Sequence, residues 1–303
     1  MMNQDKVLTS DGERVNDNVK SDRVEDKVKE EINQQSQPKE GEQILKEQVQ
    51  MALTEYRRQN KALFFSSFSG GLEVGFSLLL MGLLYTMFHG QMTKAGLDFA
   101  LAFAYPIGFI FVIIGRSELF TEHTTLAVLP VLNRSVSIGR LLKLWTLIFI
   151  GNLLGGYIFA FLTTEMAPAM GIISIEAFEH LAKKMLKYNW WITLSSAIFA
   201  GWLMGLLSWL NSSSQDTISR IFIIVLVTAT IGLAGLHHSI VGSIEVFAGF
   251  LVSSKVTFND YLFFQLWATL GNIIGGTVFV AVVKYSHLGK ANFIQDRHFH
   301  PEG

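Results

Sequence analysis

The sequence predicts an all-α integral membrane protein with six transmembrane spans, built as two inverted halves of three spans each. Half of its 303 residues are hydrophobic and only 16% are charged. The charge is concentrated in residues 1–61, which hold 11 of the 24 Lys/Arg and 13 of the 25 Asp/Glu. Six apolar stretches follow, and a bilayer core takes about 20 helical residues to cross. A sequence block that occurs twice in the chain indicates that the six spans form two related halves.

The N-terminal region divides into two parts. Residues 1–39 are polar and contain no aromatic side chain, so they cannot bury enough apolar surface to offset their ordering entropy. We expect a disordered cytoplasmic tail there, and a second cytoplasmic tail over 288–303. Over 40–61, apolar residues recur at steps of three and four, opposite charged residues. This pattern predicts an amphipathic helix on the membrane surface or on the cytoplasmic face of the protein.

The six apolar stretches lie within a channel domain predicted for residues 62–287. Their bounds are 64–88, 99–133, 141–163, 190–210, 218–253 and 260–284. The second and fifth are too long for one span, and polar residues interrupt each of them. We therefore predict broken second and fifth helices, with residues 116–123 and 236–239 non-helical and facing each other near mid-depth. Irregular backbone is tolerated at that depth only where it lines a cavity or is buried in protein.

A repeated block supports the two halves. The sequence Gly-Asn-Leu-Leu-Gly-Gly begins at Gly151, and Gly-Asn-Ile-Ile-Gly-Gly begins at Gly271, an offset of 120 residues (271 − 151). The same offset carries Gly115, where the first break begins, onto Gly235, where the second begins. Three spans per half is an odd number, so the halves must be inverted, and such repeats place a site at their interface. The glycines predict close helix packing, and the two asparagines predict hydrogen bonds to the freed carbonyls of the breaks.

Basic residues near the span ends favour an orientation with both termini in the cytoplasm. Nine of them fall on the side of the N-terminus and five on the other. The loop 164–189 does not follow this trend, because it carries basic residues on the predicted outer side. We expect a multi-pass protein in the inner membrane of a bacterium, with the lipid bilayer as its surroundings. The absence of cysteine excludes a disulfide framework and thiolate chemistry. No basic stripe indicates nucleic acid as a partner.

Ionisable residues at membrane depth are the candidate functional residues. Each costs at least ~2.5–3.5 kcal/mol at the centre of a lone helix, so each needs a partner or a wet cavity. Glu118 and His238 are the strongest candidates because they lie in the breaks. Arg116 and Glu118 equally suit a structural ion pair that holds the loop. The others are Glu73, Glu122, His123, His237 and Glu245. Glu73 equally suits a hydrogen bond between subunits, and no role is assigned to Glu245.

The same cluster of carboxylates and imidazoles allows a second class of protein, a membrane metalloenzyme. Di-iron sites in helix bundles use Glu-x-x-His on each of two helices. That spacing is absent around Glu118 and His123. The pattern therefore favours a protein that is not an enzyme and carries no metal or other cofactor.

These motifs together resemble the formate/nitrite transporter family, over residues 45–285. The resemblance rests on Gly115-x-x-Glu118-Leu119-Phe120-Thr121, on the pair His238-Ser239, and on the Trp…Gly-Asn-x-x-Gly-Gly block that occurs twice. It is greatest to the branch with a long hydrophilic N-terminal tail. It implies an aquaporin-like protomer with its own pore, a homopentamer, and small monovalent anions such as formate, nitrite and hydrosulfide as substrates.

The resemblance also implies roles for individual residues. His238 would stand between two apolar constrictions, near Thr121, with Glu118 as an acidic neighbour. An anion that enters an apolar ring loses its water, whereas a weak acid escapes that cost by accepting a proton, which imidazole can lend. The constriction positions are Tyr105, Phe109, Leu119, Phe120 and Ile231. Secondary positions on the pore loops are Arg116, Glu122, His123, His237 and Ser239.

The sequence departs from the family pattern in ways that leave the substrate open. Gly201 and Gly242 stand where the family usually has asparagine, Ile231 replaces a phenylalanine, and Glu122 and His123 replace small uncharged residues. A pore for another small solute, neutral or cationic, is the alternative within transport. We expect His238 to face the pore and its neighbour His237 to point aside, into helix packing or toward Glu118.

Overall fold

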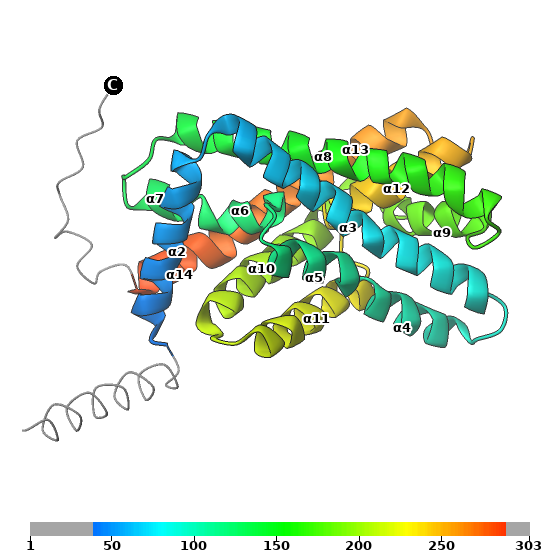
Figure 1. Ribbon diagram of the computed structural model, residues 1–303, viewed down its shortest axis with the longest axis horizontal. Helices are drawn as coiled ribbons and strands as arrows, with labels where there is room; N and C mark the ends of the chain where they lie inside the picture. The colour runs from blue at the N-terminus through cyan, green and yellow to red at the C-terminus, as the bar shows by residue number, and fades with distance from the viewer. Residues whose placement is uncertain (1–38, 289–303) are drawn as a thin grey trace, which may run out of the picture. The chain divides into compact units, whose positions relative to one another are not determined.

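A computed structural model describes residues 39–288, and every regular element within them is helical. Six helices are long and apolar enough to cross a membrane, as predicted (Figure 1). The first four are α3 (Asn60–Phe88), α4 and α5 together (Lys94–Gly115), α8 (Ile138–Ala169) and α10 (Trp190–Ser213). The last two are α11 (Thr217–Ala234) and the segment Phe258–Leu288, which comprises α13 (Phe258–Gly276), the π-helix η1 (Thr277–Val282) and α14 (Val283–Leu288). The predicted tails at 1–38 and beyond 288 lie outside the described residues.

The predicted amphipathic helix is α2 (Gly41–Arg57), which lies across one end of the bundle (Figure 1). Its apolar stripe is buried, and the amide of Gln48, which is fully buried, donates hydrogen bonds to Ser208 and Ser212 of α10, each at 3.3 Å. The Tyr56 hydroxyl donates to the carbonyl of Ala127 at 2.7 Å. These contacts bind the buried side of α2 to the rest of the protein.

Two interruptions divide the long apolar stretches. α5 (Pro106–Gly115) ends before residues 116–119, and α6 (Phe120–Leu126) follows; α11 ends before residues 235–240, and α12 (Val241–Val252) follows. The prediction was wrong about the extent of the first interruption, because residues 120–123 are helical. The carbonyl of Leu119 accepts hydrogen bonds from the backbone N–H groups of Glu122 and His123, at 3.1 and 3.3 Å, which restarts the helix.

A further irregularity separates α4 (Lys94–Ala104) from α5 at Tyr105. Pro106 has no backbone N–H and cannot continue the hydrogen-bond ladder. The Ser77 hydroxyl, on α3, compensates by donating to the Tyr105 carbonyl at 2.6 Å and accepting from the Gly108 N–H at 3.1 Å. The chain bends here without leaving these polar groups unpaired.

Glycines let two pairs of spans, α3 with α8 and α10 with α13, approach at backbone distance. A Cβ on Gly155 would lie 2.1 Å from the Phe68 carbonyl oxygen, and one on Gly275 would lie 2.1 Å from that of Ile198. The predicted packing role of these glycines is confirmed. Gly201 is equally closed, because a Cβ there would lie 2.3 Å from the Asn272 carbonyl oxygen. At Gly242 it would lie 2.3 Å from the Phe264 ring, so neither position has room for the asparagine usual in the family.

Candidate functional site

Two buried asparagines hold the two interruptions by the same set of contacts. Asn152 of α8 donates to the carbonyls of Ser67 and Glu118 at 2.7 and 2.8 Å, and accepts from the Phe120 N–H at 2.8 Å. Asn272 of α13 donates to the carbonyls of Ala197 and His237 at 2.8 and 3.0 Å, and accepts from the Ser239 N–H at 2.8 Å. The predicted bonds to the freed carbonyls are confirmed. Each amide thus ties one long helix to one interruption.

The first turn of α6, directly after the first interruption, meets the second interruption at Thr121 and His238. The Thr121 hydroxyl lies 2.8 Å from Nε2 of His238, and both residues are buried. The backbone N–H of Val241 donates to Nδ1 of the same ring at 3.2 Å, so this nitrogen is an acceptor. In the neutral ring, Nε2 then carries the proton and donates to Thr121. The histidine is held in one tautomer by the first turn of α12.

The five predicted constriction positions are all buried. The Phe109 ring packs edge-on against the His238 ring, with centroids 5.2 Å apart and an angle of 81°. Tyr105 packs against Phe109, with centroids 5.3 Å apart. Phe120 packs against Phe149 at 4.9 Å. The exposed fractions are 6% or less for the whole set: Tyr105, Phe109, Leu119, Phe120 and Ile231.

His237 points away from Thr121, into helix packing. Its Nδ1 lies 2.8 Å from the Ser196 hydroxyl, and its Nε2 lies 3.1 Å from the Met185 carbonyl. Of the two directions considered for His237, the structure shows packing and not Glu118. The neighbouring hydroxyl of Ser239 is buried and has no hydrogen-bond partner within the described residues. A polar group is therefore free next to His238.

Glu118 makes contacts toward α2 and not toward His238. Its carboxylate lies 2.5 Å from the guanidinium of Arg58 and 2.5 Å from Nε2 of His123. Arg58 follows directly on α2 and also pairs with Glu55 at 2.7 Å. Burial, and then the Glu118 carboxylate, raises the pKa of Glu55 above its ordinary value. Of the two readings of Glu118, the contacts match the structural ion pair, with Arg58 in place of Arg116.

The remaining charged positions of the first interruption are separate from this ion pair. Arg116 is exposed in the protomer and has a left-handed backbone, with φ of 62°. Glu122 is half-buried on α6. Glu73, on α3, accepts hydrogen bonds from Ser69 at 2.7 Å and Ser117 at 2.9 Å. Glu73 therefore holds the start of the interruption from within the same protomer.

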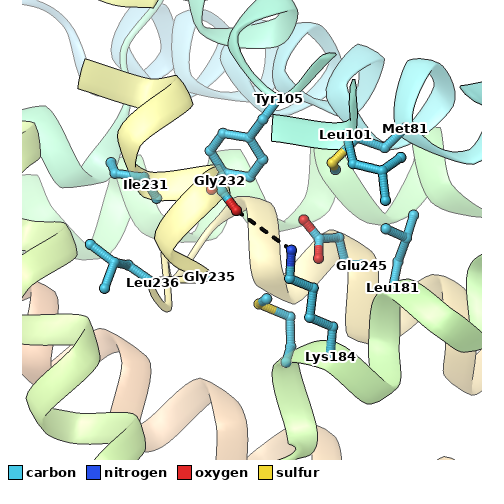
Figure 2. A pocket seen from close by; sticks show the side chains of 11 residues that line it. Met81, Leu101, Tyr105, Leu181, Lys184, Ile231, Gly232, Gly235, Leu236 and Glu245 are labelled. Atoms are coloured by element: carbon cyan, nitrogen blue, oxygen red, sulfur yellow. Dashed lines mark hydrogen bonds between the residues drawn. The ribbon is translucent and has the colours of Figure 1, made fainter. Parts of the chain in front are cut away.

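A small cavity of ≈ 20 Å³ lies beside the second interruption, on the side of α9 (Ile175–Leu186). This volume holds about one water. Figure 2 shows Lys184 and Glu245 pointing into the same space, with the lysine ammonium 3.5 Å from the Gly232 carbonyl. Tyr105 and Ile231, two of the predicted constriction positions, line the same cavity. A cation and a buried carboxyl therefore stand next to the apolar positions.

Sequence reasoning missed Lys184 as a site residue. It entered only the count of basic residues, where the loop 164–189 stood out because its lysines lie on the predicted outer side. This surplus of lysines in the loop 164–189 was the sequence feature that could have pointed to Lys184. Lys184 lies on the buried edge of an amphipathic helix, which places its ammonium in the cavity and not in open solvent. Glu245, which had no assigned role, is its neighbour there (Figure 2).

Six helices of membrane-spanning length, with two helix interruptions next to a buried histidine, match the architecture of a membrane channel or transporter. The formate/nitrite transporter family profile matches residues 42–286, and the chain belongs to this family, which is one of transporters. The inner membrane protein YfdC of Escherichia coli (strain K12) is 32% identical over 238 residues, covering 77% of this chain and 74% of that protein. Among solved structures, an FNT family ion channel has a TM-score of 0.72 at 22% identity, covering 81% of this chain and 98% of that one. A pentameric formate channel with formate bound has a TM-score of 0.64 at 20% identity, covering 75% and 97%.

Proposed function

We propose that this protein carries a small monovalent anion of a weak acid, such as formate, across the inner membrane of a bacterium, linked to protons through His238. The observation that carries the proposal is the buried pair of His238 and Thr121, bonded at 2.8 Å and surrounded by apolar side chains. A bare anion is poorly solvated among such side chains. An acid that takes a proton on entering and releases it on leaving crosses as a neutral molecule.

The residues around His238 suit this role. Nε2 carries the only proton of the neutral ring, because Nδ1 accepts from Val241, so the ring can pass a proton to the anion only after taking up a second one. The unpaired hydroxyl of Ser239 supplies a further hydrogen-bonding group nearby. Lys184, on the α9 side, places a positive charge next to Tyr105 and Ile231, where it would stabilise an anion that approaches these apolar positions.

The alternative substrate, a neutral or cationic solute, rested on the carboxylates of the first interruption. The carboxylates concerned are Glu118, Glu122 and Glu73. Glu118 is paired with Arg58 and His123, whereas Glu73 accepts from two serines and Glu122 is half-buried on α6. The cation Lys184, by contrast, lies in a cavity next to the apolar positions. Glu245 lies in the same cavity, so this placement of charge favours an anion when the Glu245 carboxyl is protonated.

The proposed assembly is a homo-oligomer of five copies, each with its own pore and with both termini in the cytoplasm. The support is the likeness to a pentameric formate channel and the basic residues counted near the span ends. Native mass spectrometry in mild detergent that shows only monomer or dimer would contradict it. A reporter fused after Gly303 is expected to be active only in the cytoplasm.

The function is tested by flux into liposomes that contain the purified protein. The panel comprises formate, nitrite, hydrosulfide, ammonium and glycerol. We expect flux of the weak-acid anions that depends on pH between about 5 and 8, where imidazole titrates. His238→Asn keeps a hydrogen-bonding group and removes the group that takes up and passes on the proton, so the pH dependence of the maximal flux is expected to disappear.

His237→Asn is the matched control, because His237 is the adjacent histidine and bonds only within the helix packing. It is expected to lower the yield of folded protein and to leave the pH dependence in place. Loss of the pH dependence in His237→Asn and its retention in His238→Asn would contradict the assignment. Transport of ammonium or glycerol without any anion would contradict the proposed substrate class.

A further inference from the structure

One stripe of α9 carries three ionisable residues outside the membrane-spanning helices. Glu176, His180 and Lys184 follow one another at intervals of four residues, which places them along the same side of the helix. Lys184, the last of them, reaches the cavity. His180 therefore lies one helical turn from the cation that is proposed to attract the anion.

A stack of three rings joins this stripe to the end of α3. The Tyr85 ring lies between His89, with centroids 4.5 Å apart and an angle of 15°, and His180, with centroids 4.5 Å apart and an angle of 31°. Tyr85 is buried, and its hydroxyl donates to Glu176 at 3.4 Å. Nε2 of His89 lies 3.6 Å from the same carboxylate. The His180 ring on α9 is thus packed against Tyr85 of α3.

The charges around His180 are mixed. Lys184 and Glu176 face it from α9, Tyr85 and His89 face it from the end of α3, and Asp98 faces it from α4. Burial, followed by the positive charge of Lys184, lowers the pKa of His180 below its ordinary value. The ring is therefore neutral at neutral pH and gains its charge only in acid.

We infer that His180 is a proton-controlled element of the anion-attracting site, whose protonation places a second cation beside Lys184 and strengthens anion capture at acidic pH. The inference rests on the proposed function, because it assigns a further residue to the same cavity. If the termini are cytoplasmic, α9 lies on the outer face, and capture responds to the acidity outside the cell. A weak acid that must enter with a proton is then captured most strongly where protons are abundant.

The expected size of the effect is modest. A unit charge added near the anion changes its affinity by about two- to fivefold at the dielectric constant of water, once the offset from the Glu176 and Asp98 carboxylates is included. The effect falls on the concentration of anion at half-maximal flux and not on the maximal rate, since His180 does not line the cavity.

The test measures equilibrium exchange of labelled formate in liposomes, with equal pH on both sides and the anion concentration varied. In the parent, the half-saturating concentration is expected to fall about two- to fivefold from pH 8 to pH 5.5. His180→Gln is expected to keep the pH 8 value throughout, and His180→Arg is expected to show the low value throughout. Lys183→Gln is the control: it removes a charge of α9 whose ammonium is bound to Glu179 at 2.7 Å, and it is expected to behave as the parent does.

A second readout does not depend on transport. Nuclear magnetic resonance of labelled histidine, assigned with His180→Gln, gives the titration midpoint of His180. Lys184→Gln is expected to raise this midpoint. Formate is expected to raise it in the parent, because coupling between proton and anion is reciprocal. An unchanged midpoint in both cases, or a pH-dependent half-saturation that persists in His180→Gln, would overturn the inference. Absence of formate exchange in the parent contradicts the proposed function, and the midpoint in Lys184→Gln still decides whether the two residues are coupled.

Discussion

Removing the Asn152 amide is expected to be among the most damaging changes that delete only a few atoms. Asn152→Ala removes three hydrogen bonds, two donated to the carbonyls of Ser67 and Glu118 and one accepted from the Phe120 N–H. The residue is fully buried, so water does not replace the lost partners. The loss falls on both the long helix α3 and the first interruption.

The magnitude follows from these contacts. A buried donor left without a partner costs about 1–3 kcal/mol, and each further net hydrogen bond contributes about 0.5–1.5 kcal/mol. The Phe120 N–H is such a donor, and two carbonyls lose one bond each. We therefore expect Asn152→Ala to lower the free energy of unfolding by about 2–6 kcal/mol. Asn272→Ala is expected to fall in the same range, because its three bonds are equivalent.

The assay is equilibrium unfolding in mixed micelles with increasing denaturing detergent, followed by circular dichroism. Asn211→Ala is the matched control, because Asn211 lies on α10 and both side-chain polar atoms are buried without a hydrogen-bond partner in the described part of the chain. Its free energy of unfolding is expected to change by less than about 1 kcal/mol. If Asn152→Ala costs no more than Asn211→Ala, the asparagine does not hold the interruption.

Three other perturbations have defined outcomes. Gly201→Asn, which introduces the amide usual in the family, is expected to abolish the yield of monodisperse protein in gel filtration, whereas Gly139→Asn is expected to have no such effect, since no atom lies within 4 Å of a Cβ there. Lys184→Gln is expected to raise the half-saturating formate concentration severalfold at unchanged maximal flux, measured at pH 8; an unchanged value would remove Lys184 from the site. Hydrogen bonding from Ser219 lowers the pKa of Asp216, so this cap stabilises α11 above the ordinary carboxyl pKa, and its contribution is lost as the pH falls through the lower folded value. The difference in melting temperature between the parent and Asp216→Ala is therefore expected to be largest near neutral pH and to vanish in strong acid.

Much of the fold was predictable because bilayer thickness constrains the length of each span. Apolar runs of about 20 residues or more have few alternatives to a spanning helix. The amide contacts were predictable for a related reason: a freed carbonyl at membrane depth needs a donor, and the repeated Gly-Asn block supplied one at the same offset as the interruptions. Asn152 and Asn272 could be assigned to these carbonyls without knowledge of the packing.

The details that failed depend on contacts between distant parts of the chain. The partner of Glu118 could not be chosen from the sequence, because Arg58 lies 60 residues earlier, at the end of a helix that was expected only to lie on a surface. The restart of the helix at Phe120 depends on the acceptor that Asn152 provides. Lys184 reaches its cavity only because α9 packs against the spans. In each case the sequence gives the type of residue, but the partner that its side chain reaches depends on how the helices pack.

The contacts of Glu118 bear on how the proposed proton transfer would work. Since Arg58 and His123 occupy its carboxylate, Glu118 cannot serve His238 as the acidic neighbour that the resemblance implied. Nδ1 of His238 accepts the Val241 N–H, and protonation there would break that bond. A stable imidazolium is therefore disfavoured by geometry, and the ring would carry a second proton only while the anion lies beside it. The proton that the ring passes to the anion is taken from the side of entry, so one proton crosses with each anion and the ring is left neutral. On this mechanism, uptake of the acid is neutral overall, and a membrane potential applied to the liposomes is expected to leave the flux unchanged.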